Sequence, residues 1–127
     1  MAVAGSITVA ASKVGPLTRY EIDWLSSAGG EVTENTFSAK SGELVEVRFV
    51  PDGGGTQPTD AYDLTITDAD GTDILAGTGA NLSNATATAV VPVISTYFRR
   101  HLTAGLLTPT IANAGNAKGG TIVLLVR

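Results

Sequence analysis

The chain has 127 residues, a formal net charge of −4 and no cysteine. This length suits one domain, and a domain of this size buries roughly two-thirds of its unfolded surface without cross-links. The lack of cysteine excludes disulfides, thiolate metal sites and thiol catalysis. The acidic balance argues against nucleic acid as a partner, because phosphate binding needs clustered basic side chains.

Charged residues make up 16% of the chain, below the ~25% typical of globular domains. A sparsely charged surface is typical of a protein that packs against neighbours in an assembly, and it also fits an ordinary small β-domain. The longest apolar runs are far shorter than the ~18 residues of a membrane-spanning helix. We therefore expect neither a membrane nor a nucleic acid as a partner.

Residues 1–18 are expected to form an N-terminal arm. Residues 7–9 favour a short strand, and Gly15-Pro16 interrupts it. We expect the arm to pair either with its own sheet or with a neighbouring subunit. Residues 19–127 are then expected to form the main domain.

The first clear strand runs over residues 19–26, where apolar and polar residues alternate. Trp24 lies on its apolar face, which favours core packing over the alternative role of an interface anchor. Residues 31–38 are expected to return as a polar strand, and residues 39–42 to turn. The apolar face of the first strand is predicted to present Tyr20, Ile22 and Trp24.

Two further strands are expected over residues 44–50 and 61–68. Residues 51–60 between them contain three glycines and two prolines, and they predict a loop. By alternation, the inward side chains of the two strands are Val45, Val47, Phe49, Tyr62, Leu64 and Ile66.

The remaining chain predicts a tight turn over residues 68–71 and a return strand over 72–76. A strand over residues 85–91 ends at Pro92, and residues 93–105 fit either a short helix or a strand. The last part, residues 106–127, is expected to form a closing hairpin. Its second run is almost wholly apolar, which is typical of a strand covered on both faces.

These elements amount to about eight strands at 8–12 residue spacing, with no alternation of strands and helices. The pattern predicts an all-β, single-domain fold, either a β-sandwich or a jelly-roll-like barrel, with an N-terminal arm.

One candidate partner contact is the basic cluster of Arg99, Arg100 and His101. Bidentate arginine–carboxylate pairs would let it contact an acidic partner surface. The alternative is a solvated turn with basic side chains. No G-x-S-x-G motif accompanies the single histidine, so a serine hydrolase triad has no support.

A second candidate contact is the glycine run Gly53, Gly54 and Gly55. It lacks the Gly-Lys-Ser/Thr ending of a phosphate-binding loop, and therefore predicts a flexible surface loop. In an assembly, such a loop is also a natural contact segment.

The aspartate-rich stretch from Asp68 to Asp73 is similar to the start of a calcium loop. It lacks the third ligand before the glycine and the late glutamate of an EF-hand. A hairpin turn with Gly71 at a positive φ is the favoured interpretation. We expect no catalytic site, no cofactor and no bound metal.

Three stretches of the chain carry a family resemblance. They are Arg19-Tyr-Glu-Ile-Asp-Trp24, the segment from Val47 to Gly53 that leads on to Asp68-Ala-Asp-Gly71, and Ile111-Ala-Asn-Ala-Gly-Asn-Ala-Lys-Gly119. With these stretches, the chain resembles small virion proteins of tailed bacteriophages, of the capsid cement or decoration class.

The resemblance implies a structural protein present in many copies per virion, made in the host cytoplasm and located on the capsid surface. It implies two partners, the major capsid protein and the chain itself, as a homodimer or homotrimer. No individual residue role is carried over, because the class has no shared motif. Alternatives are a phage tail or head–tail component, and a cell-surface β-sandwich module that binds carbohydrate or calcium.

Overall fold

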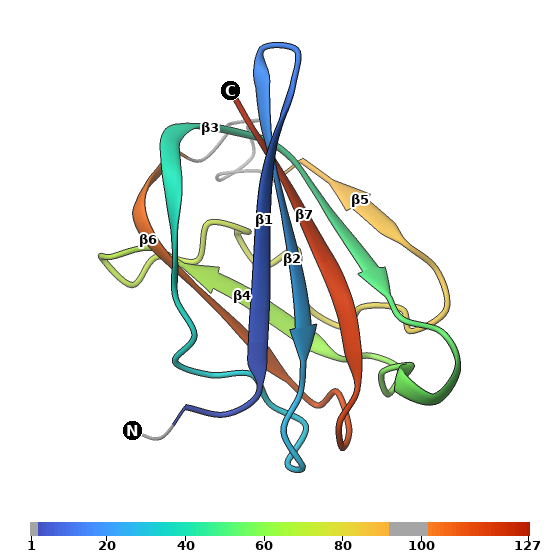
Figure 1. Ribbon diagram of the computed structural model, residues 1–127. Coiled ribbons are helices and arrows are strands. Elements are labelled where there is room, and N and C mark those ends of the chain that lie inside the picture. Colours follow the sequence, from blue (N-terminus) through green and yellow to red (C-terminus); the bar gives the residue numbers. More distant parts are fainter. Residues whose placement is uncertain (1–2, 92–101) are drawn as a thin grey trace.

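The computed structural model describes residues 3–91 and 102–127 (Figure 1). Within these residues the chain forms seven strands and one short 3-10 turn, and all strand pairs are antiparallel. The predicted all-β fold is therefore confirmed. The elements are β1 (Ser6–Val14), β2 (Leu17–Leu25), β3 (Phe37–Pro51), η1 (Gly54–Thr56), β4 (Asp63–Thr67), β5 (Thr88–Val90), β6 (Leu102–Ala112) and β7 (Gly119–Val126).

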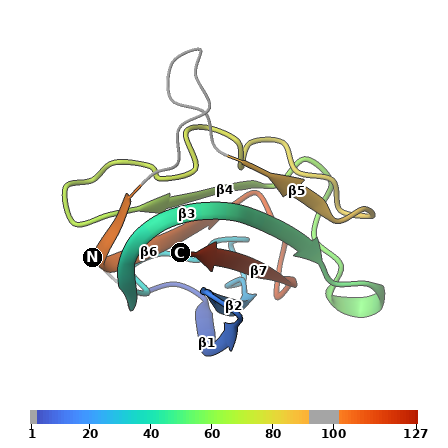
Figure 2. The ribbon, with the colours of Figure 1, turned by 90° about the horizontal axis from the view of Figure 1, so that it is seen from above.

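Strand β3 belongs to both layers of a sandwich. Its first half, from Phe37 to Glu43, pairs with β6, and its second half, from Leu44 to Pro51, pairs with β7. One layer therefore has the order β1-β2-β7-β3, with β5 beside β3, and the other has the order β3-β6-β4. Figure 2 shows β3 as an arch, through which one continuous sheet folds back on itself.

Two irregularities in the pairing accompany the bend of β3. The register with β6 shifts between Ala39 and Gly42, and the register with β7 shifts between Leu44 and Glu46. An extra residue in one strand bends it and increases its local twist. Gly42 lies at the bend, where a Cβ would collide with the carbonyl oxygen of Arg127. The predicted turn at this point is wrong, because the chain bends there without reversing.

The second irregularity also changes which side chains of β3 face the core. Leu44 is fully buried, whereas Val45, which simple alternation placed inward, is only half-buried. Beyond this point the alternation resumes, and Val47 and Phe49 are buried as predicted.

Two other predicted strands are also wrong. Residues 31–36 form a loop rather than a strand, and Val32 exchanges backbone hydrogen bonds with Ile111 of β6. Residues 72–76 make a single bridge to β4 and then turn. Both segments are held by isolated backbone contacts to a strand rather than by a continuous ladder.

The predicted closing hairpin over residues 106–127 is wrong as well, although both of its strands form. β6 pairs with β3 and β4, whereas β7 lies between β2 and β3, so residues 113–118 cross from one layer to the other. The prediction that the last strand is covered on both faces is confirmed only in part: Ile122 and Leu124 on the inner face and Val123 on the outer face are each at most 3% exposed, but Thr121 and Leu125 on the outer face are half-buried. Of residues 93–105, those up to His101 lie outside the described residues, and the rest begin β6.

Aromatic side chains join the two layers in the core. Trp24 of β2 packs against Tyr62, which precedes β4, with ring centroids 5.6 Å apart, and Tyr20 packs against Phe37 at 6.1 Å. The Tyr20 hydroxyl accepts a hydrogen bond from the backbone N–H of Lys40. Core packing of Trp24 follows from its burial, and the predicted inward residues of β2 and β4 are all buried: Tyr20, Ile22, Trp24, Tyr62, Leu64 and Ile66.

We expect Gly42→Ala to lower the free energy of unfolding by roughly 1–3 kcal/mol, because the added methyl group must displace the Arg127 carbonyl or alter the bend. Gly53→Ala is the matched control, since its Cβ position is open and its φ is −101°. It should change stability by less than about 0.5 kcal/mol. Denaturant unfolding of both variants measures the difference, and equal stabilities would show that the bend needs no glycine.

Candidate interaction surfaces

Strand β1 forms an outer edge of the sheet (Figure 1). It pairs with β2 along its whole length, from Ser6 to Val14, and among the described residues no segment hydrogen-bonds to its other side. Its side chains are exposed or half-buried throughout, and Lys13 is the one charged residue in it. A long, largely uncharged edge of this kind is a template for the addition of another strand.

The turn between β1 and β2 determines which backbone groups of β1 face outward. Gly15 has a φ of +59° and is followed by Pro16, which fits a two-residue turn of type II′. The flanking residues Val14 and Leu17 then form a hydrogen-bonded pair, and such pairs alternate along an antiparallel ladder. The residues whose N–H and C=O groups face away from β2 are therefore Ile7, Val9, Ala11 and Lys13.

The opposite end of the sheet is protected. The loop that follows β4 folds back along this strand and hydrogen-bonds to it through its backbone. The N–H of Ile74 donates to the carbonyl of Ile66, and the N–H of Leu64 donates to the carbonyl of Gly79, both at 2.8 Å. Among the residues that the structure describes, the edge at β4 is therefore covered and the edge at β1 is open.

The outer face of the β1-β2-β7-β3 layer carries two ion pairs. On β2, Nη1 of Arg19 lies 2.6 Å from Oε2 of Glu21, and on β3 Arg48 pairs with Glu46. These side chains keep between 29% and 52% of their surface in solvent. Each pair alone therefore contributes only about 0–1 kcal/mol to stability.

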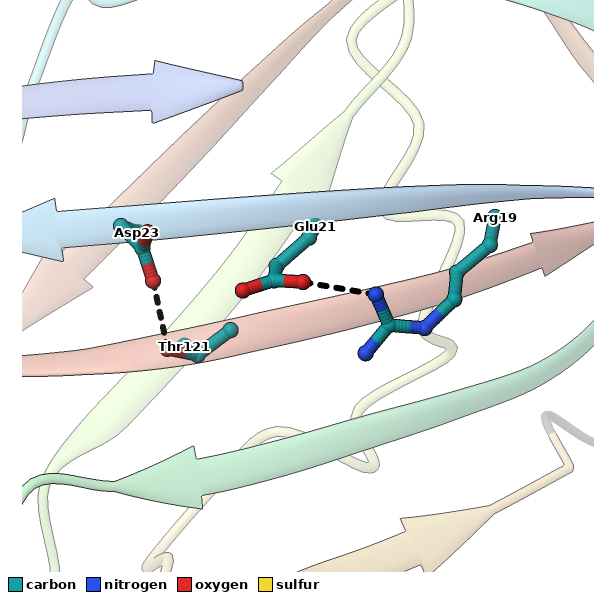
Figure 3. A network of polar contacts seen from close by, with 4 residues as sticks. All are labelled: Arg19, Glu21, Asp23 and Thr121. Carbon is teal, nitrogen blue, oxygen red and sulfur yellow. Dashed lines mark hydrogen bonds and ion pairs between the residues drawn. The ribbon is translucent and has the colours of Figure 1, made fainter. Parts of the chain in front are cut away.

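Strand β7 runs between the two ion pairs. Figure 3 shows Arg19 and Glu21 reaching from β2 over β7, where Thr121 donates a 2.6 Å hydrogen bond to Asp23. Val123 is on this outer face, in register with charged residues on both sides, yet it is only 3% exposed. The aliphatic stems of those long side chains account for its burial.

The predicted glycine contact, Gly53 to Gly55, lies on the surface just after β3. Nζ of Lys118 donates to the carbonyl of Gly55 at 3.0 Å, which ties the loop to the connection between β6 and β7. Thr56 donates a hydrogen bond to the carboxylate of Asp52. Apart from each glycine and its two chain neighbours, no heavy atom lies within 4 Å of a Cβ position at any of the three glycines, so the loop is accessible.

The predicted basic contact of Arg99, Arg100 and His101 lies outside the described residues. Its role as a partner contact stays a prediction.

The aspartate-rich stretch forms the turn expected of it. Gly71 has a φ of +83°, and its N–H donates to the carbonyl of Asp68. Oδ1 of Asp68 also accepts the N–H groups of Asp70 and Thr72. In the described parts of the chain, no group of three or more acidic, histidine or cysteine side chains is placed to hold a metal ion.

Two titratable groups next to each other at the start of β4 have shifted pKa values. Burial raises the pKa of Tyr62 to about 12, and the negative charge of Asp52 adds to this shift. The pKa of Asp63 is lowered, because its carboxylate accepts hydrogen bonds from the N–H of Asn81 at 2.9 Å and the side-chain amide of Asn113 at 2.8 Å. Asp63 thereby fastens the covering loop and the end of β6 to β4.

A surface hollow lies beside the tip of the β1–β2 hairpin. The described residues that line it are Ala11, Ser12, Lys13 and Thr18. Lys13 is the one titratable group among them, so these residues suit a contact surface better than acid–base chemistry.

Sequence reasoning missed both the open edge and the charge pattern of the outer face. The sequence did contain a signal for the open edge, because residues 6–12 carry no charge over a length that suits a strand. The order Arg-x-Glu in β2 and Glu-x-Arg in β3 was also visible. The reversed order of charges in β2 and β3 becomes informative only when the strand order places β7 between the two strands.

We expect about 1 mM calcium to leave the melting temperature unchanged, since Asp68 is engaged by backbone N–H groups of its own turn. Thermal melts with calcium and with a chelator make the comparison. An upward shift that grows with calcium concentration would contradict this interpretation of the turn.

We expect stability to fall as the pH rises from about 10 to 12, because an unfolded tyrosine with a pKa of about 10 loses its proton while folded Tyr62 keeps it. Tyr62→Phe should weaken this decline. Thermal melts of both proteins across that range measure it, and identical pH profiles would mean that Tyr62 does not contribute.

The chain matches no protein-family model, no curated protein and no solved structure. Among its described residues, no helix has the length and apolar character needed to cross a membrane.

Proposed function

We propose that this chain is a non-enzymatic structural protein of a tailed bacteriophage, which binds the outer face of the capsid as a cement or decoration protein and stabilises the mature shell. The observation that carries the proposal is the long edge strand β1, which is open among the described residues, whereas the edge at β4 is covered. The resemblance of the three sequence stretches supplies the virion context.

The size of the β1 contact suits a repeated assembly. Four residues of β1 each offer one N–H and one C=O outward, and a backbone hydrogen bond contributes a net of about 0.5–1.5 kcal/mol. Association itself costs about 4–15 kcal/mol. A single strand addition is therefore weak, but a lattice repeats it at every site, and a protein that binds only the mature lattice stabilises that lattice by mass action.

The partners follow from the same proposal. A strand of the major capsid protein is the main candidate for β1, and the accessible glycine loop, Gly53 to Gly55, is a further contact across a subunit boundary. A tail or head–tail role would use the same kind of edge, and copy number separates it from a capsid role.

A carbohydrate-binding module is less well supported, because it needs an exposed aromatic platform. The five aromatic side chains in the described residues are each at most 8% exposed: Tyr20, Trp24, Phe37, Phe49 and Tyr62. Together they fill the core and leave no platform on the described surface.

The role itself is tested by counting this chain in purified particles of the phage that encodes it, by quantitative mass spectrometry against the major capsid protein. A simple ratio to the capsid subunits is the expected result. A few copies per particle would move the chain to the tail or a vertex, and its absence from particles would overturn the proposal.

We expect Ala11→Pro to weaken binding to mature capsids at least about tenfold, because it removes an outward N–H and blocks the edge. The fold should tolerate it, since this N–H faces away from β2. Ala11→Val is the matched control, as it keeps the N–H and suits a strand. Capsid co-sedimentation measures binding and a thermal melt checks folding; equal binding of the two variants would exclude the β1 edge as the contact.

A further inference from the structure

The strand registers arrange the outer-face side chains of one layer in rows across the strands. One row reads Ala10, Glu21, Val123, Arg48 and Ala89. The next row reads Ser12, Arg19, Leu125 and Glu46. In both rows the central residue belongs to β7.

Strand β7 separates charges of opposite sign within each row. In the first row Glu21 lies on one side of β7 and Arg48 on the other. In the second row the order is reversed, with Arg19 on the first side and Glu46 on the second. The small or uncharged side chains of β1 and β5 flank the charges.

This pattern is complementary to itself. If two copies meet face to face about a two-fold axis that runs along β7, each row meets its own reverse. Arg19 then faces Glu46 of the second copy, and Glu21 faces Arg48 of the second copy. We propose that the outer face of the β1-β2-β7-β3 layer binds the same face of a second copy of this chain, with the two-fold axis along β7.

The alternating signs also argue against other occupants. A uniformly acidic or basic partner would be attracted by one member of each row and repelled by the other. Complementary charges give specificity and orientation, and like charges placed opposite each other disfavour wrong partners. A second copy is the partner that places an opposite charge against the charged residues on both sides of β7.

A third row sets a limit on the strength of this contact. It reads Thr8, Asp23, Thr121 and Val50, so Asp23 would face Val50 of the second copy without an opposite charge. The hydrogen bond from Thr121 keeps Asp23 partnered when water leaves. Val50, which is 38% exposed, would meet this carboxylate and gain little apolar contact, so the row adds little to the association.

The area of the face predicts a weak dimer. Four strands at ~4.8 Å spacing and about eight residues at ~3.3 Å give roughly 500 Å² per copy. The total of roughly 1,000 Å² lies at the lower end for specific interfaces. Because the charged side chains stay partly in solvent, the association should be strongest at low ionic strength.

Two polarity swaps test the proposal on the purified chain. The β2 swap combines Arg19→Glu with Glu21→Arg, and the β3 swap combines Glu46→Arg with Arg48→Glu. Each swap keeps the net charge and the possibility of an ion pair within its strand, but it places like charges on both sides of β7. Sedimentation velocity at low salt should show self-association of each swap weakened at least about tenfold relative to the unaltered chain.

Rescue distinguishes a specific contact from a damaged fold. An equimolar mixture of the two swapped chains should form a heterodimer, because each row then meets opposite charges again. A chain that carries all four substitutions should self-associate like the unaltered protein. Thermal melts of every variant check that they are folded.

Several outcomes would overturn the proposal. They are an unaltered chain that stays monomeric up to about 1 mM, a dimer that is insensitive to salt, swaps without effect, and a mixture of folded swaps that stays monomeric. An unaltered chain that associates regardless of the swaps uses another surface, such as the β1 edge. The test needs no capsid, so its result is independent of the proposed function.

Discussion

The bend in β3 is the constraint on which the two-layer arrangement depends. A single strand can hold β6 in one layer and β7 in the other only if it changes neighbours along its length. The shifts in register produce this change, and Gly42 leaves room for the carbonyl of Arg127 at the bend. As a result β7 lies in the middle of its layer, with its inner face fully buried.

The edges of the sheet at β4 and at β1 differ in whether other parts of the chain cover them. At β4, the following loop satisfies the strand's backbone groups, and the carboxylates of Asp63 and Asp73 hold that loop in place. At β1, the described residues provide no such cover. Natural sheets usually protect their edges, which is the reason for proposing a partner strand at β1.

The two proposed contacts, at the β1 edge and on the outer face, extend from the β1-β2-β7-β3 layer in different directions. A strand added to β1 would extend the layer within its own plane, whereas a second copy on the outer face would stack against that plane. The two contacts do not compete for the same atoms. Each is weak by its own energetics, and a protein that makes both can connect several neighbours, which suits a repeated assembly.

The local sequence determined much of the fold. Period-2 alternation located the strands that became β2 and β4 and their buried side chains, and the apolar run located β7. These signals are local, because side chains of a strand alternate between its two faces wherever that strand is placed. The turn at Asp68 to Gly71 was equally local, since its backbone groups and the Asp68 carboxylate hydrogen-bond within it.

Strand pairing was decided only by the tertiary structure. Residues 39–42 have the composition of a turn, yet they continue β3 because β6 and β7 pair with its two halves. Likewise β6 and β7 look like a hairpin in sequence but lie in different layers. The open edge at β1 depends on the same choice of neighbouring strands. So does the reversed order of charges in the pairs Arg19 with Glu21 and Glu46 with Arg48. Alternation fixes the face of each residue, whereas the strand that lies beside it is set by long-range packing, which no local pattern encodes.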